Sequence, residues 1–204
     1  TLWLGYSRGW TGIGWPVALV ADAVVAGVTL RALTPDHLDA YRIASMLQWS
    51  LLAAYFVSVA VRTLIRGRSV ALFEIVQVAA ALVIAFVGTS LLTQATGVLP
   101  AAIGVISLAM GAACYFVTFV FMEGRRDLGR NLYFYSTLAL VLVVAGLVLV
   151  AREQWVAAVF AVLAVIAVVM WSRTGRLYLL LHGAAYVVAA SLASQALQYG
   201  AWAL

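Results

Sequence analysis

The chain has 204 residues, of which 66% are hydrophobic and 9% are charged, and its mean hydropathy is +1.10. In soluble domains roughly a quarter of the residues are charged. This composition therefore excludes an ordinary soluble domain and predicts a protein whose apolar surface faces lipid. The net charge of +5 at pH 7 comes from twelve arginines without any lysine. These arginines stand in short connections between apolar runs, which argues against a nucleic-acid-binding surface and for contact with a membrane.

Seven apolar runs follow a short aromatic segment, residues 1–12, which is predicted to lie at the membrane interface because Trp and Tyr prefer the headgroup level. Each run has close to the ~20 residues that a helix needs to cross the hydrocarbon core. We therefore predict an all-α fold, a polytopic transmembrane helical bundle that forms one integral membrane domain over residues 1–204. Six spans are the alternative, if the fifth and sixth runs form a shallow hairpin. The seven predicted spans are residues 13–33, 44–64, 70–92, 98–122, 132–151, 155–171 and 177–204.

The distribution of arginines predicts the orientation of the bundle. With seven spans, nine arginines fall on the side of the N-terminus, and Arg31, Arg42 and Arg152 fall on the other side. Because positive charge favours the cytoplasmic side, the N-terminus is predicted to be cytoplasmic and the C-terminus outside. Eight of the nine stand in connections between spans, where we expect them to contact anionic lipid headgroups. These eight are Arg62, Arg66, Arg68, Arg125, Arg126, Arg130, Arg173 and Arg176.

This orientation is tested by the loop Arg125–Arg130, the most charged connection of the chain. A reporter fused in this loop, or a cysteine introduced there and labelled in intact cells, is expected to be on the cytoplasmic side. Reaction of the loop with a membrane-impermeant label added from outside would show that the predicted topology is wrong.

A row of small residues marks the fourth predicted span. Gly104 and Gly111 are seven residues apart and share a helix face, and Ser107 lies between them on that face. Small side chains let two membrane helices approach closely. We therefore predict a close helix contact along this row.

Asp22 is the most informative ionisable residue, since its position nine residues after Ile13 places it ~14 Å into the first span. A carboxylate near the bilayer centre costs ~3 kcal/mol on insertion scales, so such residues have a function or a polar partner. Three interpretations remain open: a role in transport or proton relay, a polar contact for packing or assembly, or a depth that differs from this estimate.

Further polar residues lie in the third and seventh predicted spans. Glu74 and Gln77, three residues apart, share a face about one turn into the third span, and His182 lies at a similar depth in the seventh. Glu74 pairs with His182 if these two spans touch. The alternative is that Glu74 reaches toward water or meets Arg66 or Arg68.

Tyr186 lies one helical turn after His182, on the same face and at nearly the depth of Asp22. Asp22, Tyr186, His182, Glu74 and Gln77 are therefore candidate proton-linked residues, which form a polar ladder from the middle of the membrane to the cytoplasm if their helices are neighbours.

Several kinds of site are excluded by the residues present. A retinal protein needs a lysine for its Schiff base, and the chain has none. A haem held by two histidines is not expected because only His182 lies within a span, although a single contact from His182 to a pigment or haem of a partner stays open. Neither a metal-binding motif nor a catalytic motif is present, so no metal, catalytic residue or cofactor is predicted. Cys114, the single cysteine, is interpreted as a small buried hydrophobic residue.

Two segments carry a family resemblance. Gly67-Arg68-Ser69-Val70 together with Phe73-Glu74-Ile75-Val76-Gln77, and Arg130-Asn131-Leu132-Tyr133-Phe134-Tyr135 at the start of an apolar helix, resemble segments of large bacterial multi-pass membrane proteins that form a family of unknown function. The resemblance implies a bacterial inner-membrane origin and a place within a longer chain. It implies no activity and no functional residues.

The sequence favours a non-enzymatic integral membrane module, which is a subunit, scaffold or sensor region of a larger membrane assembly or longer chain. Short connections and a single deeply placed ionisable residue are the reasons for this interpretation. The alternative is a small-molecule, lipid or proton-coupled transporter that uses Asp22 with Tyr186 and His182. The expected partners are the lipid bilayer and other membrane subunits or further copies of the chain, without nucleic acid, in a bacterial cytoplasmic membrane.

Overall fold

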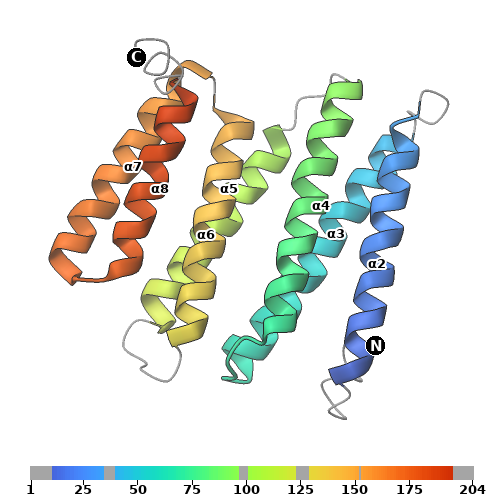
Figure 1. Ribbon diagram of the computed structural model, residues 1–204, viewed down its shortest axis with the longest axis horizontal. Coiled ribbons are helices and arrows are strands. Elements are labelled where there is room, and N and C mark those ends of the chain that lie inside the picture. Colours follow the sequence, from blue (N-terminus) through green and yellow to red (C-terminus); the bar gives the residue numbers. More distant parts are fainter. Residues whose placement is uncertain (1–10, 35–39, 97–100, 123–128, 152, 195–204) are drawn as a thin grey trace, which may run out of the picture. The chain divides into compact units, whose positions relative to one another are not determined.

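The structure is a computed structural model that describes residues 11–34, 40–96, 101–122, 129–151 and 153–194. All regular secondary structure in these residues is helical, and two of the helices continue into a π-helical turn (Figure 1). The elements are α2 (Thr11–Ala32), α3 (Tyr41–Ala60) with η2 (Val61–Ile65), α4 (Leu72–Thr96), α5 (Ala101–Phe116) with η3 (Val117–Met122), α6 (Gly129–Val150), α7 (Glu153–Thr174) and α8 (Leu177–Ala193).

The described helices confirm the predicted all-α membrane bundle. Six of them are long and apolar enough to cross a membrane, and α8 is a shorter apolar helix of 17 residues. The chain is therefore an integral membrane protein with multiple spans. The shallow hairpin on which the six-span alternative rested is wrong, because α6 and α7 have 22 residues each, and a crossing by α8, which would make seven spans, stays a prediction. Of the predicted seventh span, residues 195–204 lie outside the described part of the chain, as do residues 1–10 of the predicted interfacial segment.

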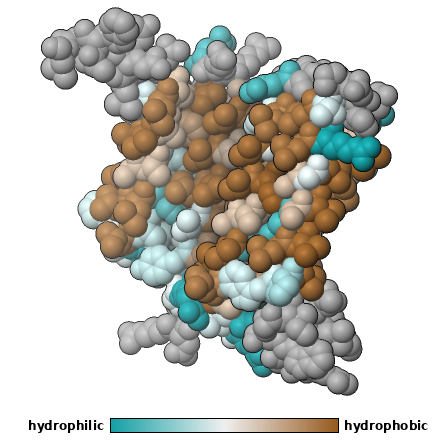
Figure 2. All heavy atoms as spheres, turned by 45° about the vertical axis from the view of Figure 1, so that its right-hand side comes forward, coloured by the Kyte–Doolittle hydropathy of each residue, from teal (hydrophilic) through white to brown (hydrophobic). Residues whose placement is uncertain are grey.

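Hydrophobic side chains cover the helices on the outside as well as between them. Large hydrophobic residues are exposed on every helix, for example Val20 at 63% and Ile65 at 77% of their surface. On the face shown in Figure 2, hydrophobic residues cover most of the helix surface, and hydrophilic residues gather mainly near the helix ends. This arrangement suits lipid, because hydrocarbon solvates apolar side chains and leaves helix packing to depend on close fit and polar contacts.

The contacts divide the chain into two compact units, residues 1–100 and residues 101–204. The single membrane domain stays a prediction, and the two units are described separately below. In the first unit, α2, α3 and α4 contact one another. Trp15 near the start of α2 packs on Phe73 near the start of α4, with 4.6 Å between ring centroids. Ala32, Ala44 and Leu92 pack together at the opposite end, so α3 runs antiparallel to α2 and α4.

In the second unit, α5 packs along α6, and α7 packs along α8, which also contacts α6. The predicted close contact of the fourth span is confirmed, since α5 and α6 approach at glycines on both helices. A Cβ atom added to Gly146 would lie 2.9 Å from the Gly104 carbonyl oxygen and 2.9 Å from the Leu108 side chain. Ser107, between the two glycines of α5, is fully buried.

In each unit, one glycine with positive φ follows the end of a helix. Gly67 has φ 61° and follows η2, and Gly175 has φ 68° and follows α7. This left-handed conformation is strained for other residues and is a common way to stop a helix. In the first unit it produces a tight turn, in which the Arg68 amide donates to the Arg62 carbonyl at 3.2 Å.

The glycine contact between α5 and α6 is tested by Gly146→Ala. The added methyl group has no room, so this variant is expected to lower the free energy of unfolding by about 1–3 kcal/mol, the usual cost of overpacking. Gly27→Ala is the matched control, because a Cβ atom at Gly27 in α2 meets nothing within 4 Å. Thermal unfolding of both variants in lipid nanodiscs measures the difference. Equal stability of the two variants would contradict the close contact.

Candidate functional site

The first polar contact in the unit of residues 1–100 joins α2 and α3. Asp22 lies at the middle of α2, as the sequence predicted, and its side chain is partly buried. The Tyr55 hydroxyl of α3 donates to Asp22 Oδ1 at 3.0 Å and lies 3.4 Å from the Ala18 carbonyl oxygen. Tyr55 is itself 5% exposed, so the phenol is held between the two helices. The carboxylate of Asp22 is thus a hydrogen-bonded contact between helices.

A second polar contact in this unit connects all three helices. Gln48 of α3 is fully buried; its Nε2 donates to Thr29 Oγ1 of α2 at 2.8 Å, and its Oε1 accepts from Thr89 Oγ1 of α4 at 3.4 Å. Gly88 leaves the space that this amide occupies, because a Cβ atom there would collide with Gln48 Nε2. Interhelical hydrogen bonds of this kind hold membrane helices together where apolar burial supplies no driving force.

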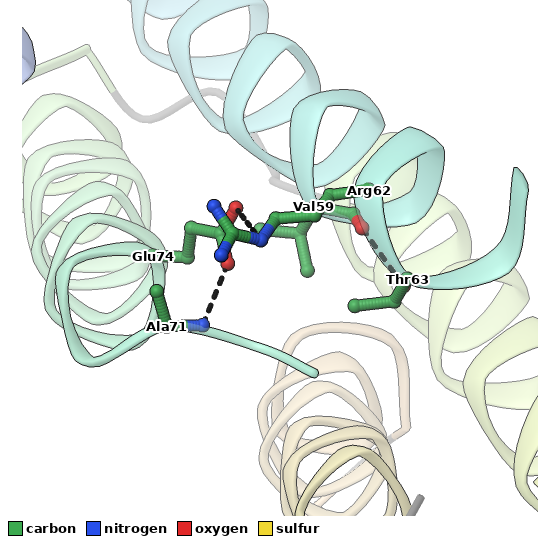
Figure 3. Close-up of polar contacts among 5 residues, drawn as sticks. All are labelled: Val59, Arg62, Thr63, Ala71 and Glu74. Carbon is green, nitrogen blue, oxygen red and sulfur yellow. Dashed lines mark hydrogen bonds and ion pairs between the residues drawn. The ribbon is translucent and has the colours of Figure 1, made fainter. Parts of the chain in front are cut away.

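The third contact lies where α3 and η2 lead into α4 (Figure 3). Arg62 of η2 reaches toward Glu74, with 3.4 Å between Nε and Oε1, and the Ala71 amide donates to Glu74 Oε2 at 2.8 Å. Ala71 directly precedes α4, so Glu74 satisfies a free amide at the helix start in the manner of a capping box. Glu74 is 2% exposed, and its charge is balanced by an arginine within its own unit.

Gln77 lies on the same face of α4, one turn deeper than Glu74. The residue is 6% exposed, and its Nε2 has no hydrogen-bond partner among the described residues. Its position beside Glu74 confirms the shared face that the spacing predicted, but the structure brings no acceptor to its amide nitrogen within the described ranges.

The fourth contact belongs to the second unit and joins α5 to α8. The Tyr115 hydroxyl lies 3.1 Å from His182 Nδ1 and 2.9 Å from the Tyr186 hydroxyl. His182 and Tyr186 are each 4% exposed. Phe160 of α7 stacks on Tyr186 at 6.2 Å, and Tyr178 meets the His182 ring edge-on at 5.9 Å. The predicted shared face of His182 and Tyr186 is confirmed, and a phenol from another helix links them.

The predicted pairing of Glu74 with His182 would join the two units, and it stays a prediction. Glu74 has the contacts with Arg62 and Ala71, and His182 has the hydrogen bond to Tyr115. Arg62, one helical turn before Arg66, reaches Glu74 from η2, and a contact of Glu74 with Arg66 or Arg68 stays a prediction. The ladder of five residues across both units stays a prediction.

The arginines expected to contact lipid headgroups lie at one end of each unit. Arg66, Arg68, Arg130 and Arg173 are exposed, and Arg62 and Arg176 are partly buried. Arg125 and Arg126 lie outside the described residues. Exposed arginines at a helix end suit contact with lipid phosphates.

Comparison with known proteins gives no family for the chain. No protein-family model, curated protein or solved structure matches it. The function is therefore argued from the contacts above. Among the described residues, no group of three or more His, Cys, Asp or Glu side chains could hold a metal ion.

The residues that sequence reasoning missed are the two central phenols, Tyr55 and Tyr115. A signal for them is present, since each begins a similar tetrapeptide, Tyr-Phe-Val-Ser at residues 55–58 and Tyr-Phe-Val-Thr at 115–118. Leu72 and Leu132 follow these tyrosines at the same spacing and lie in the first turns of α4 and α6. The pattern marks both tyrosines as equivalent positions in two helical hairpins.

The two roles of Glu74 can be separated by a pair of substitutions. Glu74→Gln removes the charge that faces Arg62 but keeps an oxygen that accepts from the Ala71 amide, whereas Glu74→Ala removes both. We expect stability to fall in the order wild type, Gln, Ala, with about 1 kcal/mol between the last two, the usual value of a helix cap. The free energy of unfolding in bicelles measures this, with the exposed Gln94→Ala of the same helix as control. Equal values for Gln and Ala would contradict the capping role.

Proposed function

We propose that the chain is a non-enzymatic integral membrane module, a subunit, scaffold or sensor region of a larger membrane assembly or longer chain. The observation that carries this proposal is the contact between Asp22 and Tyr55. A functional carboxylate for transport needs water, whereas this one accepts a hydrogen bond from a buried phenol of the neighbouring helix. The other polar contacts between described helices, around Gln48, Glu74 and Tyr115, are separate from one another, and in the described part of the chain they do not converge on one reactive centre.

The exposed surface supports the same proposal. Large apolar side chains cover the outside of the helices, which suits lipid and further membrane helices as partners, either other subunits or copies of the chain. The family resemblance and the nine arginines on one side support a bacterial cytoplasmic membrane with the N-terminus inside.

A second candidate function is a proton-coupled transporter of small molecules or lipids. It is favoured by the buried chain of Tyr115, His182 and Tyr186, because histidine and neighbouring hydroxyl groups inside a membrane are typical of proton pathways. In this candidate, Asp22 acts as a second proton-linked group.

Two substitutions at the contact of α2 and α3 separate the candidates. Asp22→Asn removes the negative charge but keeps an oxygen that accepts from Tyr55, whereas Tyr55→Phe keeps the charge and removes the hydrogen bond. For a module, Tyr55→Phe is expected to lower the free energy of unfolding of the chain by about 0.6–1.7 kcal/mol, the value of one hydrogen bond in a membrane, and Asp22→Asn to lower it less. For a transporter, Asp22→Asn alone is expected to abolish a pH-linked phenotype.

The measurement combines the free energy of unfolding in bicelles and the size of the complex extracted from native membranes in mild detergent with cytoplasmic pH under ion stress. Asp39→Asn makes the same chemical change in the connection between the first two predicted spans and serves as control. An intact complex together with a pH defect in Asp22→Asn would overturn the module and support the transporter.

A further inference from the structure

Tyr115, His182 and Tyr186 form a hydrogen-bonded chain whose protons can be arranged in two directions. The Tyr115 oxygen has two partners but carries one proton, so it donates to one of them and accepts from the other. In one direction, Tyr186 donates to Tyr115, and Tyr115 donates to His182 Nδ1. In the other direction, Nδ1–H donates to Tyr115, Tyr115 donates to Tyr186, and the Tyr186 proton has no described acceptor. The first direction places the imidazole proton on Nε2, for which no acceptor is described, so each direction leaves one proton unpaired among the described residues.

Among the described residues, Tyr115 of this chain is the hydrogen-bond partner of His182, and the other groups packed around the imidazole contribute rings or apolar side chains. Tyr178, His182 and Tyr186 follow one another at intervals of four residues on α8, and all three are buried. From α6, Tyr133 meets the Tyr178 ring at 6.4 Å. From α7, the groups next to Gly183 are the apolar Ala164, Ala167 and Val168. The other titratable residue described on α5 is the buried Cys114, and the described arginines of the unit, Arg130, Arg173 and Arg176, lie at or next to helix ends.

We propose that Tyr186, Tyr115 and His182 form a proton relay inside the second unit, in which a proton enters at the Tyr186 oxygen and is delivered to His182 Nδ1. The proposal goes beyond the membrane module and deepens the second candidate function by naming its proton path. Its physical basis is that each member lies within hydrogen-bond distance of the next, and that one of the two directions open to the chain is the one that delivery to Nδ1 requires.

The transfer balances at each atom. A hydronium ion gives a proton to the Tyr186 oxygen while the original Tyr186 proton passes to Tyr115 and the Tyr115 proton passes to Nδ1. Each phenol breaks one O–H bond and forms another, so neither becomes a phenolate. One N–H bond forms on the imidazole, which becomes an imidazolium, and a water molecule remains. Loss of the Nε2 proton to a second water restores a neutral histidine, now protonated at Nδ1, and the chain then has the opposite direction. The same steps in reverse, in which Nε2 takes a proton from a hydronium ion and the Tyr186 oxygen releases one to water, return the chain to its first direction.

The relay is tested by nitrogen NMR of the full chain in lipid bilayers. His182 is one of two histidines, so a His37→Gln background leaves it as a single signal. We expect neutral His182 to carry its proton on Nε2, and Tyr115→Phe to give a mixture of both tautomers. In Tyr115→Phe, the exchange of the imidazole protons with water is also expected to slow by about tenfold or more, because loss of a positioned proton-transfer group typically lowers the transfer rate by at least that factor.

Tyr186→Phe tests the far end of the chain and provides a second variant if Tyr115→Phe fails to fold. It keeps the hydrogen bond from Tyr115 to Nδ1, so the tautomer is expected to stay on Nε2 while the exchange slows. Tyr178→Phe is the matched control, because Tyr178 contacts the His182 ring at nearly the same distance as Tyr115, 5.9 Å against 5.8 Å. This variant is expected to change neither tautomer nor exchange. A wild-type proton on Nδ1, or exchange that is unaffected by Tyr115→Phe and Tyr186→Phe, would overturn the relay.

Proton movement across vesicles separates this relay from the transporter. Purified chain is reconstituted into vesicles of neutral lipid with a trapped pH dye, and an imposed pH gradient is followed. Vesicles that hold their gradient while the NMR results are as expected overturn the transporter and leave the relay standing. If the vesicles lose the gradient, and Tyr115→Phe and Tyr186→Phe show the same tautomer and the same exchange rate as the wild type, the relay is overturned. Transport by another path is then supported.

Discussion

The structure depends on the requirement that polar groups in hydrocarbon find partners within the protein. Lipid offers no hydrogen bonds, so backbone groups are paired inside helices and polar side chains must meet across helix contacts. Gln48 fulfils this requirement by bridging α2 and α4, and Gly88 is a glycine because the amide of Gln48 needs its space. Polar side chains thereby select which faces meet, whereas the apolar surface is nearly the same on every side.

The same requirement explains the ends of the helices. The start of α4 has free amides, and a water-exposed helix would leave them to solvent, but here Glu74 turns back to the Ala71 amide and is balanced by Arg62. A buried carboxylate without such partners would be costly. The π-helical turn η2, which begins directly before Arg62, brings the arginine into the contact, and turns of this type are common where a side chain must be placed for a function.

The sequence predicted the helices well because hydropathy and length are strong signals in a membrane protein. The helices themselves, the place of Asp22 at the middle of α2, the glycine row of α5 and the shared faces of Glu74 with Gln77 and of His182 with Tyr186 all follow from positions along a single helix. The partners of these residues do not, because they depend on which helices are neighbours. Tyr55 and Tyr115 were missed for this reason, and Arg62 was predicted to contact lipid and not Glu74, as each acts on a residue of another helix. Tyrosine also belongs in apolar runs for its ring alone, so its hydroxyl gives no separate signal.

The two phenols show how one local pattern can serve different chemistry. Tyr55 and Tyr115 begin nearly identical tetrapeptides, and in both hairpins a π-helical turn, a connection and an apolar helix with Leu and an aromatic residue in its first turn follow. The backbone pattern therefore fixes a hydroxyl at a corresponding level in each unit. In the first unit this hydroxyl meets a carboxylate, which only accepts, so the contact has one direction. In the second unit it meets an imidazole and another phenol, both of which donate and accept. The same position thus gives a fixed contact in one hairpin and a reversible chain in the other, and the difference lies in the partners and not in the tyrosine.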